Sequence, residues 1–445
     1  MDSGQQFNKT LGPVMLWGLG VGYVISGMYF GWNLGLPEGG PYGMLVASLL
    51  VTLMYVTFVL SYTELTCAMP RAGGAFVYSR RALGPTLGYF GGVAQLIEFV
   101  FAPPAIALAI GTYFTNFIPG TSIMAIAVTA YVLFTALNIW GVVHSAIFEL
   151  AVTILAVIEI LIFAGLTLPH FTVEKFTMNP LPNGWWGVLP AIPFAIWFYL
   201  AIEGVANVAE ETKNHQRDPI IGFLAAMATL VVCATLVFYS AIGVDGWESI
   251  VYTSADKAVT SDQPLPLALG HVVGTGHPMF HLLIAIGVFG LIASFHGIIL
   301  VSGRATFEFG RMGYAPAFLG KLHPGRKTPA AALLVNMGVG FIALATGRTA
   351  EIITIAVFGA LTLYIISLIS LFRLRKTEPD LPRPYRTPGY PYVPAISLAL
   401  AVFCLVAMIN ENRALAGIYA ILVVLGYGWY AVVTRFAPAG KGDPA

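Results

Sequence analysis

Apolar segments long enough to cross a lipid bilayer recur along the whole chain, and short polar stretches separate them. A transmembrane helix needs about 20 mostly apolar residues to cross the hydrocarbon core. The pattern predicts an all-α polytopic membrane protein that forms one domain over residues 1–445. The twelve expected spans are residues 13–36, 43–68, 86–116, 122–141, 145–168, 188–212, 221–243, 279–303, 329–346, 351–373, 393–411 and 414–435.

Positive charges indicate which ends of these helices face the cytoplasm. Lys and Arg gather in the loops after the second, sixth, eighth and tenth spans. The opposite face holds only Lys175, Lys257, Arg348 and Arg413. Because loops rich in Lys and Arg stay on the cytoplasmic side, both termini are predicted to be cytoplasmic. The start of the chain precedes no small-residue cleavage site, so we expect the first span to stay in the membrane.

Composition excludes several classes of protein. With 58% hydrophobic and 10% charged residues, the chain is too apolar for a soluble globule. A formal net charge of +1 gives no reason to expect a nucleic-acid partner. The three cysteines lie in apolar runs without metal-ligand spacing, so no metal site is expected. Neither HExxH nor GxSxG occurs, so we expect neither enzyme activity nor a cofactor.

Two of the predicted helices are interrupted at corresponding places. The first contains six glycines between residues 18 and 35 and is expected to break at ISGM, and the sixth is expected to break at AIEG. If spans 1 to 5 and 6 to 10 are halves of inverted topology, the breaks meet near the membrane midplane, where such transporters bind substrate. The alternative is that the glycines only allow close helix packing. The candidate binding residues at the breaks are Ser26, Gly27, Met28, Ala201, Glu203 and Gly204.

Acidic residues inside the predicted helices suggest what the site binds. Glu98, Glu159 and Glu203 lie in the third, fifth and sixth spans without a Lys or Arg at a matching depth. A charge at the bilayer centre costs roughly 2.5 to 3.5 kcal/mol on insertion scales, so each must be protonated, paired with a cation or in contact with water. Glu203 is the first candidate to hold a small organic cation. Glu98 either lines the same pocket or forms a hydrogen bond across helices.

Several long stretches resemble a known family of transporters. The second span and its loop, YTELTCAMPRAGGAFVYSRRALGP, and the stretch from Glu203 through VANVAEETKNHQRDP resemble signatures of the amino acid, polyamine and organocation (APC) superfamily. Within it, the ethanolamine permease group is the most similar. The segments that carry this narrower resemblance are GWNLGLPEGGPYGML, LIEFVFAPPAIALAIGTYF, PFAIWFYLAIEGV and FGALTLYIISLISLFRLRKTEPDLPRPYRTPGYP.

The resemblance implies a LeuT-like fold, with an inverted-repeat core over residues 13–373 and two peripheral helices over residues 393–435. It also implies a permease of the bacterial inner membrane that imports a small amine, ethanolamine first, by proton-coupled alternating access. One alternative is an amino-acid or polyamine permease or exchanger of the same superfamily. A channel or an intramembrane enzyme is the alternative from another class. Sodium coupling and a homodimer stay open.

The resemblance also implies roles for single residues. Trp197 stands where related antiporters close a tryptophan over the substrate, and its ring face suits an ammonium by about 0.5 to 2 kcal/mol. The alternative for Trp197 is a lipid-facing or core aromatic. Glu159 stands where proton-coupled relatives place a Lys in place of a sodium ion, so it is the candidate for ion coupling, or else a structural carboxyl. Phe295 and His296 are expected near the pocket wall formed by the eighth span, or in a helix-helix contact.

Met28 separates this chain from the amino-acid carriers of the superfamily. Those carriers usually have a Gly-Ser-Gly type break whose bare N–H groups hold the substrate carboxylate, whereas the aligned positions here are Ser26, Gly27 and Met28. A bulky Met would obstruct that contact. A substrate with an ammonium and a hydroxyl, but no carboxylate, would not need it.

Overall fold

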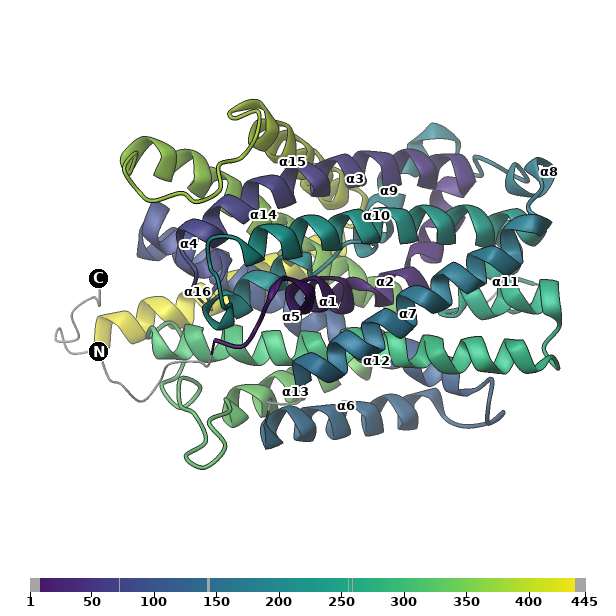
Figure 1. The fold of residues 1–445 in the computed structure, drawn as a ribbon, viewed down its shortest axis with the longest axis horizontal. Coiled ribbons are helices and arrows are strands. Elements are labelled where there is room, and N and C mark those ends of the chain that lie inside the picture. The colour runs from purple at the N-terminus through teal and green to yellow at the C-terminus, as the bar shows by residue number, and fades with distance from the viewer. Residues whose placement is uncertain (1–8, 72, 142–144, 255, 258, 437–445) are drawn as a thin grey trace.

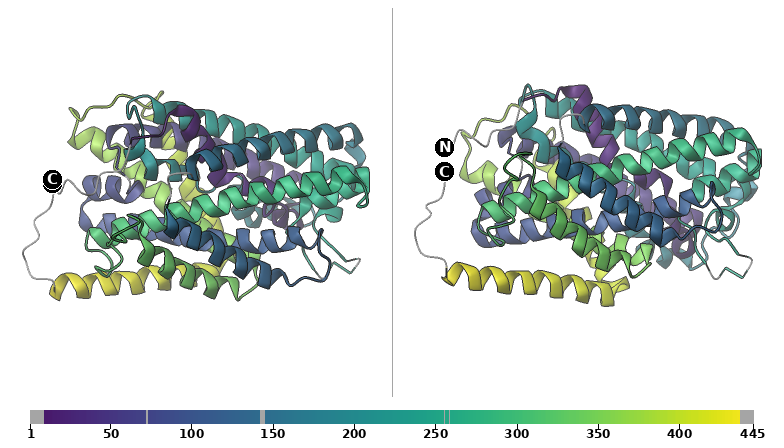
Figure 2. Two further views of the ribbon diagram at one scale, coloured as in Figure 1. Left: turned by 60° about the horizontal axis from the view of Figure 1, so that its bottom comes forward. Right: turned by 90° about the horizontal axis from the view of Figure 1, so that it is seen from below.

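The computed structural model describes residues 9–436 except 72, 142–144, 255 and 258, and these residues form a helical bundle without β-strands. Most of the long helices run side by side along the long axis (Figure 1), and the other views show the same elongated bundle (Figure 2). The elements are α1 (Pro13–Val24), α2 (Ser26–Tyr29), η1 (Trp32–Gly35), α3 (Leu36–Ala68), α4 (Ala75–Leu83), α5 (Pro85–Phe114), α6 (Ile123–Trp140), α7 (Ser145–Thr167), η2 (Leu168–His170), α8 (Val173–Phe176), η3 (Gly184–Gly187), α9 (Val188–Trp197), η4 (Ile202–Glu211), α10 (Asp218–Asp245), η5 (Trp247–Ile250), α11 (Pro264–Val273), α12 (Pro278–Arg311), α13 (Ala330–Leu344), α14 (Thr349–Thr377), α15 (Tyr392–Glu411) and α16 (Arg413–Phe436).

Helix length and hydropathy confirm a polytopic membrane protein. In the described part of the chain, ten helical segments are long and apolar enough to cross a membrane. Two shorter apolar segments, Pro13–Tyr29 and Ala330–Leu344, lie where the first and ninth spans are predicted. Together these segments coincide with the twelve predicted spans. A third short apolar helix, α11, lies in the long loop between α10 and α12 and was not predicted.

The outer surface of the bundle is apolar along its length. Large hydrophobic side chains such as Leu133 of α6, Ile147 of α7, Ile342 of α13, Val406 of α15 and Leu425 of α16 are exposed. A soluble monomer rarely exposes so large an apolar surface. Lipid is the solvent that suits this surface, because the exposed side chains are apolar and most backbone groups are hydrogen-bonded within the helices.

Several helix ends differ from the predicted bounds for electrostatic and backbone reasons. α12 continues to Arg311 and α14 to Thr377, beyond the predicted apolar spans. Charged pairs add to apolar burial in these last turns, as in the 2.8 Å pair of Arg311 with Glu308. Within α3 the backbone is not helical at Gly40, where φ is 62°, so the second span proper begins at Pro41.

A buried ion-pair cluster fixes the end of α3 to α14 and to the loop after it. Both carboxylate oxygens of Glu64 accept hydrogen bonds from Arg375 at 2.7 Å. Arg383 lies 3.1 Å from the same carboxylate, and the Thr387 N–H donates to it at 2.7 Å. A carboxylate with this many donors is well compensated despite its burial, so Glu64 is a structural residue.

Candidate functional site

A serine hydroxyl fills the first interruption of the first span. α1 ends at Val24, and the N–H of Ser26 donates to the Ser294 hydroxyl of α12 at 2.9 Å. That hydroxyl in turn donates to the carbonyl of Gly22 at 2.6 Å. In a continuous helix the Ser26 N–H would bond the Gly22 carbonyl directly. The side chain from α12 therefore satisfies two backbone groups that would be costly to leave unpaired in a membrane.

The second interruption lies after α2, at Phe30 and Gly31. Phe30 is extended, and Gly31 has a φ of 88°, which favours glycine. Two side chains satisfy carbonyls near this break: Trp32 Nε1 donates to Met28 at 3.2 Å, and the Tyr113 hydroxyl donates to Tyr29 at 2.8 Å.

The prediction that the first span unwinds at Ser26 to Met28 therefore needs a correction. These residues form the helical turn α2, and the interruptions flank this turn on both sides. Two features explain the difference. The Ser294 hydroxyl of α12 bonds the backbone at the earlier break, and the positive φ that the later break needs is adopted by Gly31. Neither is visible from the ISGM motif alone.

The sixth span leaves the α-helix after Trp197. Residues 198–201 form a turn in which Ala201 has a φ of 78°, and the chain continues as the 3₁₀ helix η4. The break was predicted at AIEG, residues 201–204, and begins three residues earlier. Glu203 and Gly204 lie in the first turn of η4. A left-handed non-glycine residue costs about 1–2 kcal/mol, and a 3₁₀ helix of this length is uncommon. Such strained backbone is concentrated at functional sites.

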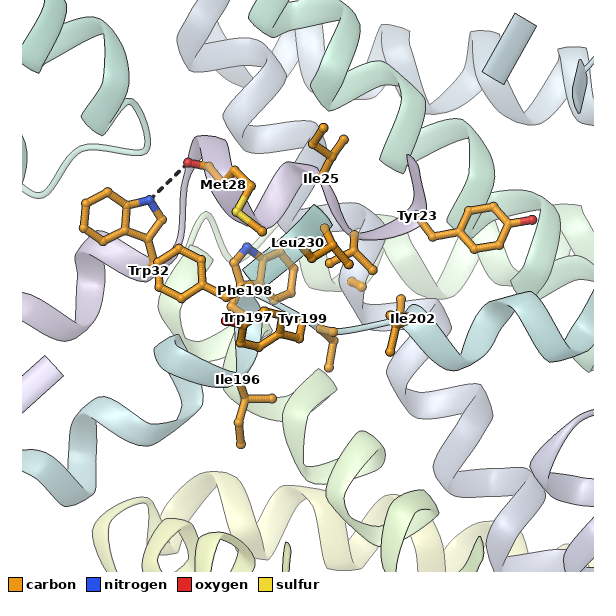
Figure 3. Close-up of a cluster of buried hydrophobic side chains, with 14 of the residues drawn as sticks. Tyr23, Ile25, Met28, Trp32, Ile196, Trp197, Phe198, Tyr199, Ile202 and Leu230 are labelled. Carbon is orange, nitrogen blue, oxygen red and sulfur yellow. Dashed lines mark hydrogen bonds between the residues drawn. The ribbon is translucent and has the colours of Figure 1, made fainter. Parts of the chain in front are cut away.

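The two breaks are in direct contact. A Cβ atom added to Gly27 would lie 2.3 Å from the Trp197 carbonyl oxygen, and one added to Gly31 would lie 2.5 Å from the Trp197 ring. Phe30 meets the Trp197 ring edge-on at 5.4 Å between centroids. Figure 3 shows Met28 and Trp197 in one buried cluster with other residues of both breaks. Glycine is therefore required at residue 27 for the two interrupted helices to cross this closely.

A small cavity lies at this crossing. In this conformation it has room for about one water molecule. The buried indole N–H of Trp197 has no hydrogen-bond partner among the described residues. A buried indole N–H usually finds an acceptor, so this donor is available for a ligand. The lining residues are Tyr23, Val24, Ser26, Ala102, Trp197, Leu200 and Ile298.

Two buried carboxyl groups from different spans lie next to each other. Glu98 of α5 and Glu203 of η4 are 0% and 1% exposed and close enough for their charges to interact. The Tyr364 hydroxyl of α14 donates to Glu203 Oε2 at 3.0 Å and shares a 3.0 Å hydrogen bond with Tyr55 of α3. Gly359 lets α14 approach the backbone of Glu98. Two adjacent carboxyls cannot both be charged without a cation, so this pair holds a proton or a cation.

Glu159 lies at a different place, beside the second interruption. Its Oε2 accepts a 2.7 Å hydrogen bond from Tyr29, the last residue of α2. A second small cavity contains Tyr29, Tyr113 and Glu159 in its wall, together with apolar residues of α11 and α12. Glu159 is thus in contact with the broken first span, but it does not line the cavity that contains Trp197.

Phe295 and His296 are not brought to either cavity. The Phe295 ring packs on Tyr131 and Phe134 of α6, at 5.2 and 5.9 Å between centroids. His296 Nδ1 lies 3.5 Å from the carboxylate of Glu149 in α7. Of the residues of the eighth span, Ser294 and Ile298 are the ones that reach the first break and its cavity.

Sequence reasoning missed several residues of this site. Three of them carry a side-chain hydroxyl within an apolar helix: Ser294, Tyr364 and Tyr29. Nothing in the local sequence distinguishes them from the other Ser and Tyr residues of this chain. Glu149 had a visible signal, since it is a further acidic residue inside a predicted span and lies four positions after the expected start of the fifth.

Polar contacts close both sides of the crossing. On one side Asn33 accepts from the N–H of Gly31 and donates to the Ser261 carbonyl at 2.7 Å. In the loop that contains Ser261, burial raises the pKa of the Asp262 carboxyl to about 6, and the hydrogen bond that it accepts from the Thr349 hydroxyl opposes this shift. On the other side, Arg304 and Glu211 form a 2.6 Å ion pair.

No group of His, Cys, Asp or Glu in the described ranges could hold a metal ion.

The first and sixth spans of this apolar helical bundle are both interrupted, and they cross at a small cavity. This is the architecture of an α-helical membrane permease. The amino acid permease family matches residues 11–429, so the chain belongs to that family. An uncharacterized transporter of Rhizobium meliloti is 27% identical over 89% of this chain and 85% of its own length.

Two further relatives show the range of substrates in the family. The branched-chain amino acid permease BcaP of Bacillus subtilis is 24% identical over 97% of this chain and 94% of its own length. The low-affinity putrescine importer PlaP of Escherichia coli is 25% identical over 96% of this chain and 93% of its own length. The chain is therefore a multi-pass membrane transporter.

Gly27→Ala should separate the two breaks. The added methyl group would meet the Trp197 carbonyl, which cannot move without the backbone of the sixth span, so overpacking should cost about 1–3 kcal/mol. We expect a lower Tm in detergent and loss of substrate binding. Gly165→Ala in α7 is the matched control, because a Cβ atom there meets nothing within 4 Å. Equal binding by both variants would contradict the contact.

Proposed function

We propose that this protein is a secondary active transporter that imports a small organic amine, ethanolamine first, by alternating access. The observation that carries the proposal is the buried pair of Glu98 and Glu203 beside the crossing of the two interrupted helices. At an effective dielectric of about 20, an ion pair at 4 Å is worth on the order of 4 kcal/mol, partly offset by desolvation. An ammonium group would thus compensate a charge that is unfavourable in the membrane.

The cavity geometry supports an ammonium site between Trp197 and the carboxyl pair. Ala102 lines the cavity and lies one turn after Glu98 on the same face of α5. Leu200 lines it from the turn that leads into η4 and Glu203. Glu98 and Glu203 do not line the cavity as it stands, so it must widen to admit a small amine. The amine would then contact the Trp197 ring and approach the two carboxyl groups past Ala102 and Leu200.

The amides of α2 argue against a substrate carboxylate. The Ser26 N–H already donates to Ser294, and the Met28 N–H donates to the Ile25 carbonyl at 3.0 Å. These are two of the three N–H groups, of Ser26, Gly27 and Met28, that a carboxylate cradle in the first span would use. A carboxylate would also lie close to Glu98 and Glu203, and the repulsion would disfavour it. A substrate with only an ammonium and a hydroxyl avoids both problems.

The relatives favour one competing substrate class. One of them is named as a putrescine importer, and a pair of carboxyls also suits a diamine. Two adjacent carboxyls bind one ammonium group better than two groups held apart by a four-carbon chain, so we place a monoamine first. Amino-acid transport is the other alternative within the family.

The remaining parts of the proposal concern topology and coupling. Both termini are cytoplasmic in a bacterial inner membrane, as the Lys and Arg of the loops indicate. Residues 13–373 form the LeuT-like inverted-repeat core, and α15 and α16 are peripheral. Import is coupled to protons, with Glu159 as the coupling residue, because its carboxyl contacts α2 through Tyr29.

Competition with labelled ethanolamine in liposomes tests the substrate class. Ethanolamine should compete well, while glycine and serine should compete poorly, because each brings a carboxylate to the acidic pair. Propanol, which has the hydroxyl but no charge, is the control and should not compete. Tight binding of serine would overturn the proposed class, and putrescine binding in preference to ethanolamine would favour a polyamine carrier.

Glu203→Gln and Trp197→Leu test the ammonium site in the same assay. Glu203→Gln keeps the shape and removes the charge, so affinity should fall by about one to two orders of magnitude. Trp197→Leu removes the ring face and should cost about tenfold or less. If both contact one ammonium, the double variant should deviate from additivity. Wild-type affinity in Glu203→Gln would place the ammonium elsewhere, with Glu98 the first residue to examine.

Glu159→Gln tests the coupling residue. Uptake driven by an imposed proton gradient should lose its dependence on the gradient, since the amide cannot bind or release a proton at this position. Glu174→Gln, a change at an exposed acidic residue of α8, is the control and should keep the dependence. Unchanged gradient dependence in Glu159→Gln would leave Glu159 with a structural role only.

A further inference from the structure

A buried carboxyl–imidazole pair lies outside the site described above. His296 Nδ1 of α12 and Glu149 Oε2 of α7 are 3.5 Å apart, and the two side chains are only 9% and 1% exposed. Within the described residues, neither oxygen of Glu149 receives a hydrogen bond, and His296 Nδ1 has no hydrogen-bond partner. A buried carboxyl without donors is unfavourable when charged, so its protonation state matters for packing.

The Glu149 carboxyl is wedged between three helices. A Cβ atom added to Gly22 of α1 would lie 2.8 Å from Glu149 Oε1, and one added to Gly297 of α12 would lie 3.0 Å from it. Thr153, one turn later in α7, donates to the Gly18 carbonyl at 3.2 Å. The carboxyl therefore touches the part of α1 that precedes its first break. A change of charge at Glu149 therefore alters the energy of the contact between α1, α7 and α12.

The other ionisable groups around Glu149 lead towards one end of the bundle. His296 faces it from α12, and Tyr23 faces it from α1. Tyr23 also lies within electrostatic range of the Arg304–Glu211 ion pair of α12 and η4. Phe134 of α6 and Phe148 of α7 enclose the imidazole from the remaining sides and carry no charge.

We propose that Glu149 and His296 form a proton-binding site whose occupancy controls the packing of α1 against α7 and α12. With one proton the pair is neutral overall, either as carboxyl and imidazole or as carboxylate and imidazolium. When the proton leaves to water on the side of the Arg304–Glu211 ion pair, one negative charge remains between glycine backbones. That charge favours separation of the helices and entry of water, which is the movement that opens the cavity to this side.

This inference rests on the proposed transport function and deepens it by assigning a second proton site on α7. Glu149 and Glu159 are ten residues apart, which corresponds to about 15 Å along a helix. Glu159 contacts α2 beyond the first break, whereas Glu149 contacts α1 before it. The two carboxyls thus contact opposite sides of the same break.

Ethanolamine uptake into liposomes, at a fixed external pH and with varied internal pH, tests the site. Wild-type uptake should slow as the internal pH falls, because the pair cannot release its proton. Part of this slowing comes from the smaller proton gradient coupled through Glu159, so Glu149→Gln should weaken the dependence on internal pH without abolishing it, and Glu149→Asp should keep it with a shifted midpoint. Thr153→Val alters the same helix contact without a titratable group and should keep the wild-type dependence. Unchanged dependence in Glu149→Gln, or a response to internal sodium in place of pH, would overturn the proposal.

Counterflow at equal pH on both sides separates this inference from the transport proposal. It needs no net proton movement, so wild type and Glu149→Gln should both show it. Its absence in wild type would contradict ethanolamine transport itself. If Glu149→Gln does not elute as a folded protein in gel filtration, the deciding measurement is the infrared carboxyl band, compared between acid and neutral pH in wild type and in Glu149→Asp. The band should shift in Glu149→Asp, and an unshifted band would contradict the site.

Discussion

Backbone groups that have no water to bond are the constraint on which this architecture depends. An interrupted helix frees N–H and C=O groups, and each one left unsatisfied inside a membrane costs several kcal/mol. In the first span Ser294, Trp32 and Tyr113 satisfy the groups around the breaks. Because Ser294 belongs to α12 and Tyr113 to α5, the same bonds tie the breaks to two other helices. A movement of those helices must therefore change the breaks as well.

Buried acidic groups are arranged around these breaks without Lys or Arg partners. Glu98 and Glu203 face each other, Glu159 has the Tyr29 hydroxyl, and Glu149 has the His296 imidazole. The arginine pairs lie instead towards the helix ends, as in the Glu64 cluster and the Arg304–Glu211 pair. This separation leaves the centre of the protein with acceptors for a proton or a small cation, while the ends are fixed by pairs that are already neutral.

The twelve spans and the existence of two breaks could be predicted because both depend on local sequence. Apolar length defines a span, and a glycine run or an acidic residue within it marks where a helix is weak. The positions of the breaks could be predicted only to within a few residues. Gly31 adopts the positive φ, whereas Gly27 lies inside the helical turn α2. Ala201 was predicted within the second break and does adopt the left-handed conformation.

The sequence by itself determined a membrane permease with acidic residues at depth, since hydropathy, charge placement and long motifs are properties of the chain alone. Only the tertiary structure decided which side chains meet. A helix turns about 100° per residue, so once Ser294 faces α1, Phe295 and His296 must point towards other neighbours. The rotation of α12 is set by packing against helices far away in sequence. That packing, which no local pattern encodes, placed His296 beside Glu149 and Tyr364 beside Glu203.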